Sequence, residues 1–103
     1  NNSELTVKIN NKKLIALYDS GNASYYSDTP IVYLDYKYKN DNYVFFTKTT
    51  VDTIGGSVDI YIYNGPNIYI NNKEYKVYYA FSNINNYDII LHKDIGGIKC
   101  LNC

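Results

Sequence analysis

Apolar and polar residues alternate along much of this chain, as they do in β-strands that bury one face. Residues 5–9 and 12–18 follow this pattern on either side of Asn10 and Asn11, which favour a tight turn, so residues 5–18 are predicted to form a β-hairpin. Further strands are expected at residues 31–35, 43–46, 67–70, 75–81 and 87–91. Residues 47–63 and 67–81 are predicted to form two more hairpins.

The spacing of these strands indicates an all-β fold. Short strands with turn signals about every 8–12 residues favour a small closed barrel or a sandwich. The 103 residues fit one domain, residues 1–103, and the 14 tyrosines and absent methionine agree with strands better than with long helices. Residues 92–97 leave room for at most one short helix near the C-terminus, followed by a final strand at residues 98–103.

The charge balance and the cysteines exclude several classes of function. Ten basic and ten acidic residues and a pI near 6.7 argue against a nucleic-acid-binding surface. No apolar run reaches the roughly 18 residues that a membrane span needs. Cys100 and Cys103 are predicted to be reduced, inert thiols, because a zinc site needs about four ligands and His92 is the only histidine. We therefore expect no metal and no cofactor.

The strongest candidate for chemistry is Asp19, which begins an Asp-Ser-Gly triplet directly after the apolar residues 14–18. A carboxylate that follows a buried strand is costly unless it has a partner or a function. In aspartic proteases two such carboxylates share one proton and activate a water molecule. Because the chain has one such triplet, this interpretation requires a symmetric homodimer. The alternative is a solvated turn carboxylate, since these residue types favour turns.

Two further segments could complete such a site. The first is the predicted tip of the second hairpin, made of Ile54, Gly55, Gly56 and Ser57. Its glycines permit positive φ, so it is expected to be either a mobile flap or an ordinary hairpin tip. The second is the end of an apolar strand, made of Ile90, Leu91 and His92. His92 is interpreted first as a structural histidine at the strand end and, alternatively, as a partner of the active turn.

The order of these features resembles the retropepsin-like aspartic proteases over nearly the whole chain. A hairpin, the triplet at Asp19, a glycine-tipped hairpin, an apolar strand and a short terminal segment follow one another. The resemblance implies a retropepsin-like closed β-barrel with a flap over the substrate and with residues 89–91 next to the active turn. It also implies that the chain termini pair with those of a second copy.

A closer resemblance rests on three motifs, namely Asp19-Ser20-Gly21-Asn22, the Asp-Thr-Pro-Ile-Val of residues 28–32, and Leu91-His92. They are similar to the soluble domain of the sporulation sigma-E factor processing peptidases (the SpoIIGA family) of endospore-forming bacteria. Lys93 departs from that family, which has proline there, and His92 departs from viral retropepsins, which have glycine. The resemblance implies a membrane-spanning N-terminal region outside these residues and a protease domain on the mother-cell side of the cell membrane.

The resemblance also implies a function and its partners. We predict an aspartic endopeptidase, active as a homodimer with one Asp19 per subunit, that removes the pro-sequence of a sigma factor precursor, with an activating protein as a further candidate partner. Gly21 is expected to orient the carboxylate through its N–H, Ser20 to hydrogen-bond across the dimer, and Asn22 to support the turn. Two alternatives stay open: a non-catalytic β-barrel that docks a protein partner, and the protease of a retroelement.

Overall fold

The N-terminal hairpin forms where the sequence predicts it. The computed structural model describes residues 3–96 of the chain. β1 (Ser3–Ile9) and β2 (Lys12–Tyr18) pair antiparallel around Asn10 and Asn11, whose φ angles are 50° and 64°. Two consecutive positive φ angles are the requirement of a type I′ turn, which asparagine tolerates better than most residues.

The rest of the described chain is also built from strands. These are β3 (Tyr25–Tyr26), β4 (Thr29–Asp35), β5 (Val44–Thr53), β6 (Gly56–Asn64), β7 (Ile68–Ile70), β8 (Lys73–Tyr75), β9 (Tyr78–Ser82) and β10 (Ile89–Leu91). The one helical segment within residues 3–96 is a 3₁₀ turn, η1 (Tyr36–Tyr38), which the Asp35 carboxylate caps by accepting the N–H of Lys37 at 3.0 Å. The predicted all-β class is therefore confirmed.

The end of the described chain contains no helix, which is consistent with the prediction of at most one short helix there. Residues 92–96 form a turn and a bend, with the N–H of Ile95 bonded to the His92 carbonyl at 2.9 Å. The strand expected at residues 98–103, with Cys100 and Cys103, lies outside the described residues. Within residues 3–96, no helix has the length and apolar character needed to cross a bilayer.

The strand predicted at residues 75–81 is divided between two different neighbours. Asn71 and Asn72 adopt φ angles of 50° and 66°, which closes a tight turn and pairs β8 with β7. Val77 is buried at the break between β8 and β9. β9 then pairs in parallel with β4, from Ile31 opposite Tyr78 onward. Local turn signals could not reveal this break, because the partner of β9 is distant in the sequence.

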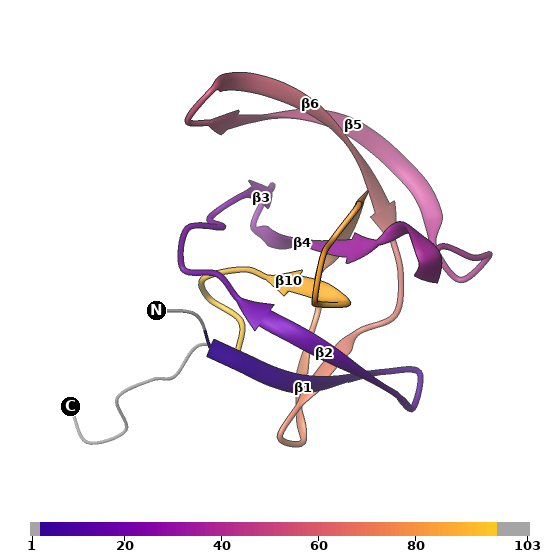
Figure 1. Cartoon of the computed structure of the whole chain (residues 1–103). Helices are drawn as coiled ribbons and strands as arrows, with labels where there is room; N and C mark the ends of the chain where they lie inside the picture. Colours follow the sequence, from indigo (N-terminus) through magenta and orange to yellow (C-terminus); the bar gives the residue numbers. More distant parts are fainter. Residues whose placement is uncertain (1–2, 97–103) are drawn as a thin grey trace.

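The strands form one sheet in the order β5-β6-β9-β4-β10-β2-β1-β7-β8, with β3 added on β4 (Figure 1). The predicted closed barrel is wrong, because a barrel needs its first and last strands to share a ladder, and β5 and β8 do not pair within residues 3–96. β8 has only three residues, and β5 belongs to a long hairpin that arches over β3 and β4 (Figure 1). The sheet is therefore open.

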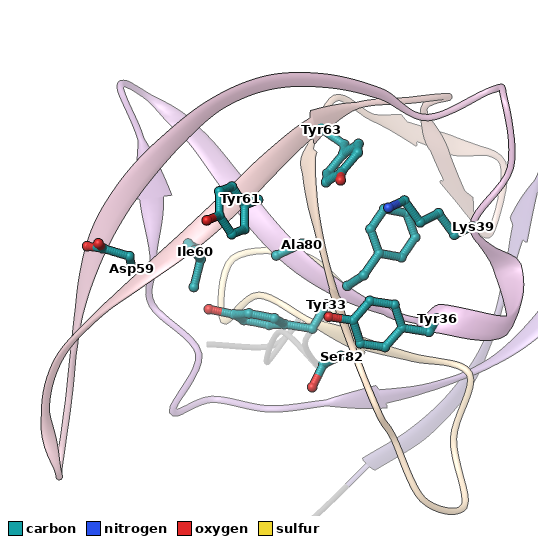
Figure 2. Close-up of a pocket in the computed structure, with 10 residues that line it drawn as sticks. Tyr33, Tyr36, Lys39, Asp59, Ile60, Tyr61, Tyr63, Ala80 and Ser82 are labelled. Carbon is teal, nitrogen blue, oxygen red and sulfur yellow. The ribbon is translucent and has the colours of Figure 1, made fainter.

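The β5/β6 hairpin joins the rest of the sheet at a single ladder pair, Tyr63 with Tyr79. Beyond this pair β6 and β9 diverge. The space between them is a cavity of about 500 Å³, and five of its ten lining residues are aromatic (Figure 2). The hairpin is thus a separate arm that leans over the sheet.

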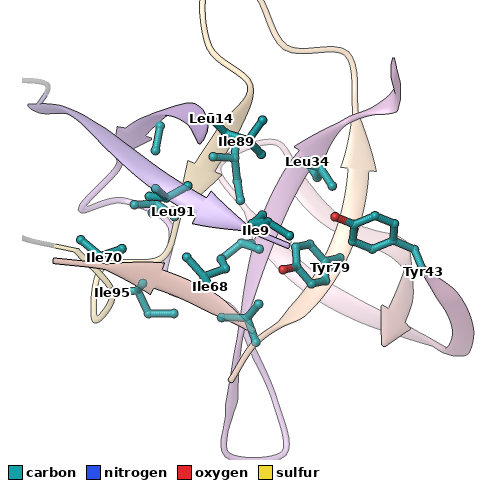
Figure 3. Packing of buried hydrophobic residues seen from close by; sticks show 14 residues of the cluster. Ile9, Leu14, Leu34, Tyr43, Ile68, Ile70, Tyr79, Ile89, Leu91 and Ile95 are labelled. Carbon is teal, nitrogen blue, oxygen red and sulfur yellow. The ribbon is translucent and has the colours of Figure 1, made fainter. Parts of the chain in front are cut away.

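The main hydrophobic core packs the N-terminal hairpin, β7 and β10 against β4 and β9 (Figure 3). Leu34, Ile68 and Leu91 are fully buried in it, and each such side chain stabilises the fold by about 1.5–3 kcal/mol. The buried Tyr79 ring keeps its hydroxyl satisfied by donating to the Pro66 carbonyl at 2.6 Å. A smaller cluster of Ile31, Ile62 and Ala80 lies between β4, β6 and β9.

Asp88 holds β10 in place between β2 and β4. Its backbone N–H donates to the Ile15 carbonyl at 2.8 Å, and its carboxylate accepts the Ile15 N–H at 2.8 Å and the Tyr38 hydroxyl at 2.6 Å. The Lys37 ammonium lies 3.6 Å away. Burial raises the pKa of Asp88, but these donors outweigh it and hold the pKa below its usual value. The ionised carboxylate therefore helps to set the register of β10.

Candidate active site

Asp19 follows β2 at the point where β2 and β10 end side by side. The parallel ladder between these strands places Leu91 opposite Tyr18. Beyond the ladder, the Tyr18 hydroxyl donates to the Lys93 carbonyl at 2.7 Å. Two of the segments selected from the sequence, the triplet at Asp19 and the end of the apolar strand, are thus neighbours in space.

The turn at Asp19 is held by its own backbone. The Asn22 N–H donates to the Asp19 carbonyl at 3.0 Å, and the Gly21 N–H donates to Asp19 Oδ1 at 2.8 Å, the contact expected of Gly21. A Cβ on Gly21 would stand 3.2 Å from Asp19 Oδ1, so glycine lets the carboxylate fold back over the turn. Ser20 is exposed at the apex. The turn therefore orients one carboxylate oxygen and leaves the other for further contacts.

Asn22 anchors this turn to the sheet. It is the only buried polar residue besides His92 within residues 3–96, and its side-chain amide donates to the carbonyls of Ile31 at 3.1 Å and Leu91 at 3.3 Å. Its own carbonyl accepts the Lys93 N–H at 2.8 Å. One asparagine thus ties the turn to both β4 and β10.

His92 lies beneath the loop that follows the turn. It is fully buried, its Nδ1 accepts the Asp94 N–H at 3.0 Å, and its ring meets the Tyr25 ring edge-on at 4.4 Å. Burial and, less strongly, the Lys93 charge lower the pKa of His92, with the Ala23 backbone opposing them. Its Nε2 has no hydrogen-bond partner within residues 3–96. The imidazole is therefore neutral at pH 7 and packs behind the turn.

Sequence reasoning did not select Tyr18, Tyr25 or Asp94. The Tyr25 hydroxyl donates to the Asp94 carboxylate, which also lies 3.0 Å from the Lys93 ammonium. With the bond from Tyr18 to Lys93, this contact ties residues 92–94 to residues 19–25, the loop of the candidate active site, which is called the active loop below. No local motif marks tyrosines in such a role in a chain with 14 of them, and only the neighbouring position of β10 brings these segments together.

The β5/β6 hairpin provides the glycine tip that the sequence predicts. Gly56 adopts a φ of 117°, and Thr53 Oγ1 donates to its carbonyl at 2.7 Å. Ser57 Oγ donates to Asp52 Oδ1 at 2.9 Å, which links the two strands near the tip. Ile54 is fully exposed at the tip, an unusual position for a large apolar side chain.

A cavity of about 290 Å³ separates the active loop from this hairpin. Its lining comes from Gly21, Ala23, Ser24 and Tyr25 on one side and from Thr50, Val51 and Asp52 on the other. The strand residues of β5, and not the predicted tip residues 54–57, therefore face the active loop in this single chain.

A single chain supplies one carboxylate, that of Asp19, at this candidate site. Asp19 is half-buried and forms no ion pair within residues 3–96. Peptide hydrolysis by carboxylates needs a charged base and a protonated acid together. A second carboxylate from another copy of the chain would supply the missing group.

Comparison with known proteins adds no assignment to this geometry. No protein-family model matches the chain, and no curated protein matches it significantly.

Proposed function

We propose that this domain is an aspartic endopeptidase that acts as a homodimer, with Asp19 of each copy as the catalytic residue. One observation carries the proposal: the half-buried Asp19 carboxylate accepts the N–H of Gly21, and Gly21 lines a cavity that is bordered on its other side by the β5/β6 hairpin. In this proposal the open sheet is a retropepsin-like fold, and the hairpin is its flap.

The chemistry follows from bringing two Asp19 carboxylates together. At about 3 Å they cannot both ionise, so one holds the shared proton and the other activates water. The charged carboxylate takes a proton from the attacking water, and the protonated one donates to the carbonyl oxygen of the substrate. The two apparent pKa values belong to the pair. The exposed Ser20 would hydrogen-bond across the dimer beneath the two carboxylates.

The hairpin would close over an extended peptide. Strand-like backbone hydrogen bonds to β5 would hold the substrate with little dependence on its sequence, and side-chain pockets would set specificity. The exposed Ile54 and the positive φ of Gly56 suit a tip that meets substrate or the partner's tip on closure.

The proposed substrate is the precursor of a sporulation sigma factor, and the reaction is removal of its pro-sequence. Asp19 to Asn22 and His92 support this assignment through the resemblance described above. The parent protein would be anchored in the cell membrane, with this domain on the mother-cell side and an activating protein as a further partner.

The isolated domain should dimerise weakly, because a membrane anchor would concentrate the parent in two dimensions. Sedimentation velocity should therefore show monomers at nanomolar concentration. A stable dimer under those conditions would contradict this expectation.

The direct test is cleavage by a tethered dimer made of two copies of residues 1–103. It would be given the N-terminal segment of a sigma factor precursor between about pH 5 and 7, where such carboxylate pairs are usually competent, with products read by mass spectrometry. Asp19→Asn in both halves should lower the rate by about 1,000-fold or more, because it removes the acid and the base. Asp28→Asn, at an exposed turn residue, should leave the rate unchanged.

Other results would favour the other functions. Binding of the precursor without cleavage, unaffected by Asp19→Asn, would indicate a docking module. Cleavage of unrelated extended peptides but not of the precursor would favour a retroelement-type protease. No cleavage and no binding would reject the proposed substrate.

A further inference from the structure

The sheet has a gap between β6 and β9. β6 pairs with β5 along its whole length, but on its other edge it meets β9 only at the pair of Tyr63 with Tyr79. β9 pairs with β4 on the far side. Next to this pair Ile62 and Ala80 still pack together in the small buried cluster, whereas residues 57–61 of β6 and 81–82 of β9 each present one edge without a ladder partner within residues 3–96. Free edges of this kind accept an additional strand readily.

The 500 Å³ cavity lies at this divergence (Figure 2). Its lining includes Tyr61 and Tyr63, which lie on one face of β6, and Ile60, which lies on the other face. Residues from both faces of the hairpin therefore border the cavity. Tyr33 and Tyr36 form the opposite wall (Figure 2). A space bordered from both faces is an opening in the sheet, and it has the form that an inserted strand would fill.

The cavity is separate from the candidate active site. None of residues 19–25 lines it, and none of its lining residues borders the smaller cavity beside the active loop. Its exposed aromatic rings include Tyr36 and Tyr61, which are 50% and 58% exposed. Large exposed aromatic side chains that gather at one place mark an interaction surface.

The charge of the cavity indicates what would fill it. The Lys39 ammonium lies 4.9 Å from the Tyr63 ring centre and 5.6 Å from that of Phe81, and it forms no ion pair within residues 3–96. Asp59, also in the lining, is already matched by Lys48 at 3.8 Å and by the Thr50 hydroxyl at 2.8 Å. The charge left without a counterpart is therefore positive, and it favours an acidic group.

We propose that the gap between β6 and β9 binds an extended polypeptide segment of a partner protein as an added strand, with an acidic side chain of that segment placed against Lys39. Backbone hydrogen bonds to the free edges supply the grip, and the tyrosine rings cover the segment's side chains. The site does not depend on Asp19, so the proposal stands or falls independently of catalysis.

The probe is an acetylated and amidated octapeptide of alternating valine and threonine with one terminal glutamate. Backbone amide shifts in ¹⁵N NMR spectra of the full chain should change saturably at residues 58–63 and 80–82, at peptide concentrations up to about 1 mM. A peptide with lysine in place of glutamate should bind about threefold more weakly. N-methylation of alternate residues should weaken binding about tenfold or more, because it removes the edge hydrogen bonds.

Two variants test the side-chain contacts. Lys39→Gln should weaken binding of the glutamate peptide about threefold, so that the glutamate and lysine peptides bind with equal affinity. Tyr61→Ala should weaken both peptides, whereas Tyr69→Ala, at a similarly exposed tyrosine on β7, should not. Dispersed amide spectra would show that each variant remains folded.

Three results would overturn the proposal. The first is absence of saturable shifts at these residues. The second is equal binding of the N-methylated and unmodified peptides, which would indicate adsorption to the aromatic rings without strand addition. The third is the appearance of the same shifts when the chain alone is concentrated, which would assign the gap to a second copy.

Discussion

Removing the side-chain amide of Asn22 should both destabilise the domain and release the turn that carries Asp19. In Asn22→Ala the carbonyls of Ile31 and Leu91 each lose a donor in a buried setting. A net contribution of about 1–1.5 kcal/mol for each hydrogen bond gives a loss of about 2–3 kcal/mol in the free energy of unfolding. The 8% exposure of Asn22 leaves little room for water to replace the donor.

A near-isosteric change separates hydrogen bonding from packing. Asn22→Asp keeps the size of the side chain but points carboxylate oxygens at two carbonyl oxygens, so at pH 7 it should destabilise the fold more than Asn22→Ala. The introduced carboxyl should have a folded-state pKa above about 3.9, because this setting favours its protonated form. The loss in free energy of unfolding of Asn22→Asp relative to the wild type should therefore shrink as pH falls toward about 4 and grow as pH rises.

Urea unfolding at two protein concentrations measures these effects without a contribution from dimerisation. Asn85→Ala, at an exposed asparagine, is the matched control and should change the free energy of unfolding by less than about 0.5 kcal/mol. A similarly small effect of Asn22→Ala would refute the argument that the amide anchors the turn. The argument would also be refuted if the loss in free energy of unfolding caused by Asn22→Asp did not change with pH.

Three further predictions concern packing and protonation. Gly65→Ala would place a Cβ 2.6 Å from the Tyr43 ring and should lower the free energy of unfolding by about 1–3 kcal/mol. Gly55→Ala, whose nearest contact would be at 3.9 Å, should leave the melting temperature unchanged. Equal effects of the two substitutions on the melting temperature would contradict this packing. The pKa of Asp88 is held low by its donors, so the free energy of unfolding of the wild type should decrease as pH falls below 3.8. In Asp88→Asn this decrease should be smaller. An equal decrease in the two proteins would contradict the role given to the Asp88 carboxylate. His92 is the single histidine, so its NMR titration can be followed without interference, and burial should place its pKa below 6.5. Because the fold favours the neutral ring, the free energy of unfolding should fall as pH drops below 6.5. A titration midpoint at or above 6.5 would show that the ring is not buried.

Local signals were enough to predict most of the elements. The Asn-Asn turn at residues 10–11 closes the first hairpin where expected, and the glycine tip ends the β5/β6 hairpin. In both cases the pattern of side chains and the φ preferences of the turn residues act over a few neighbouring positions. The triplet at Asp19 was also visible, because a turn directly after an apolar strand is a local feature.

The errors arose where distant segments compete for the same strand. Residues 75–81 have strand composition throughout, yet the turn at Asn71 and Asn72 assigns β8 to β7, and β4 pairs with β9. The prediction of a closed barrel was wrong for the same kind of reason. Alternation predicts that strands exist, but it does not say which two lie at the edges.

The all-β class, the main hairpins and the turn that carries Asp19 follow from local sequence patterns, since they depend on side-chain alternation and on backbone preferences within short windows. The position of β10 beside β2, and the bonds from Asn22 to both β4 and β10, exist only in the folded chain. The same is true of the contact between Tyr25 and His92 and of the gap between β6 and β9. These features come from contacts between residues far apart in the sequence, whose pairing is chosen by burial of the whole core and not by any local preference.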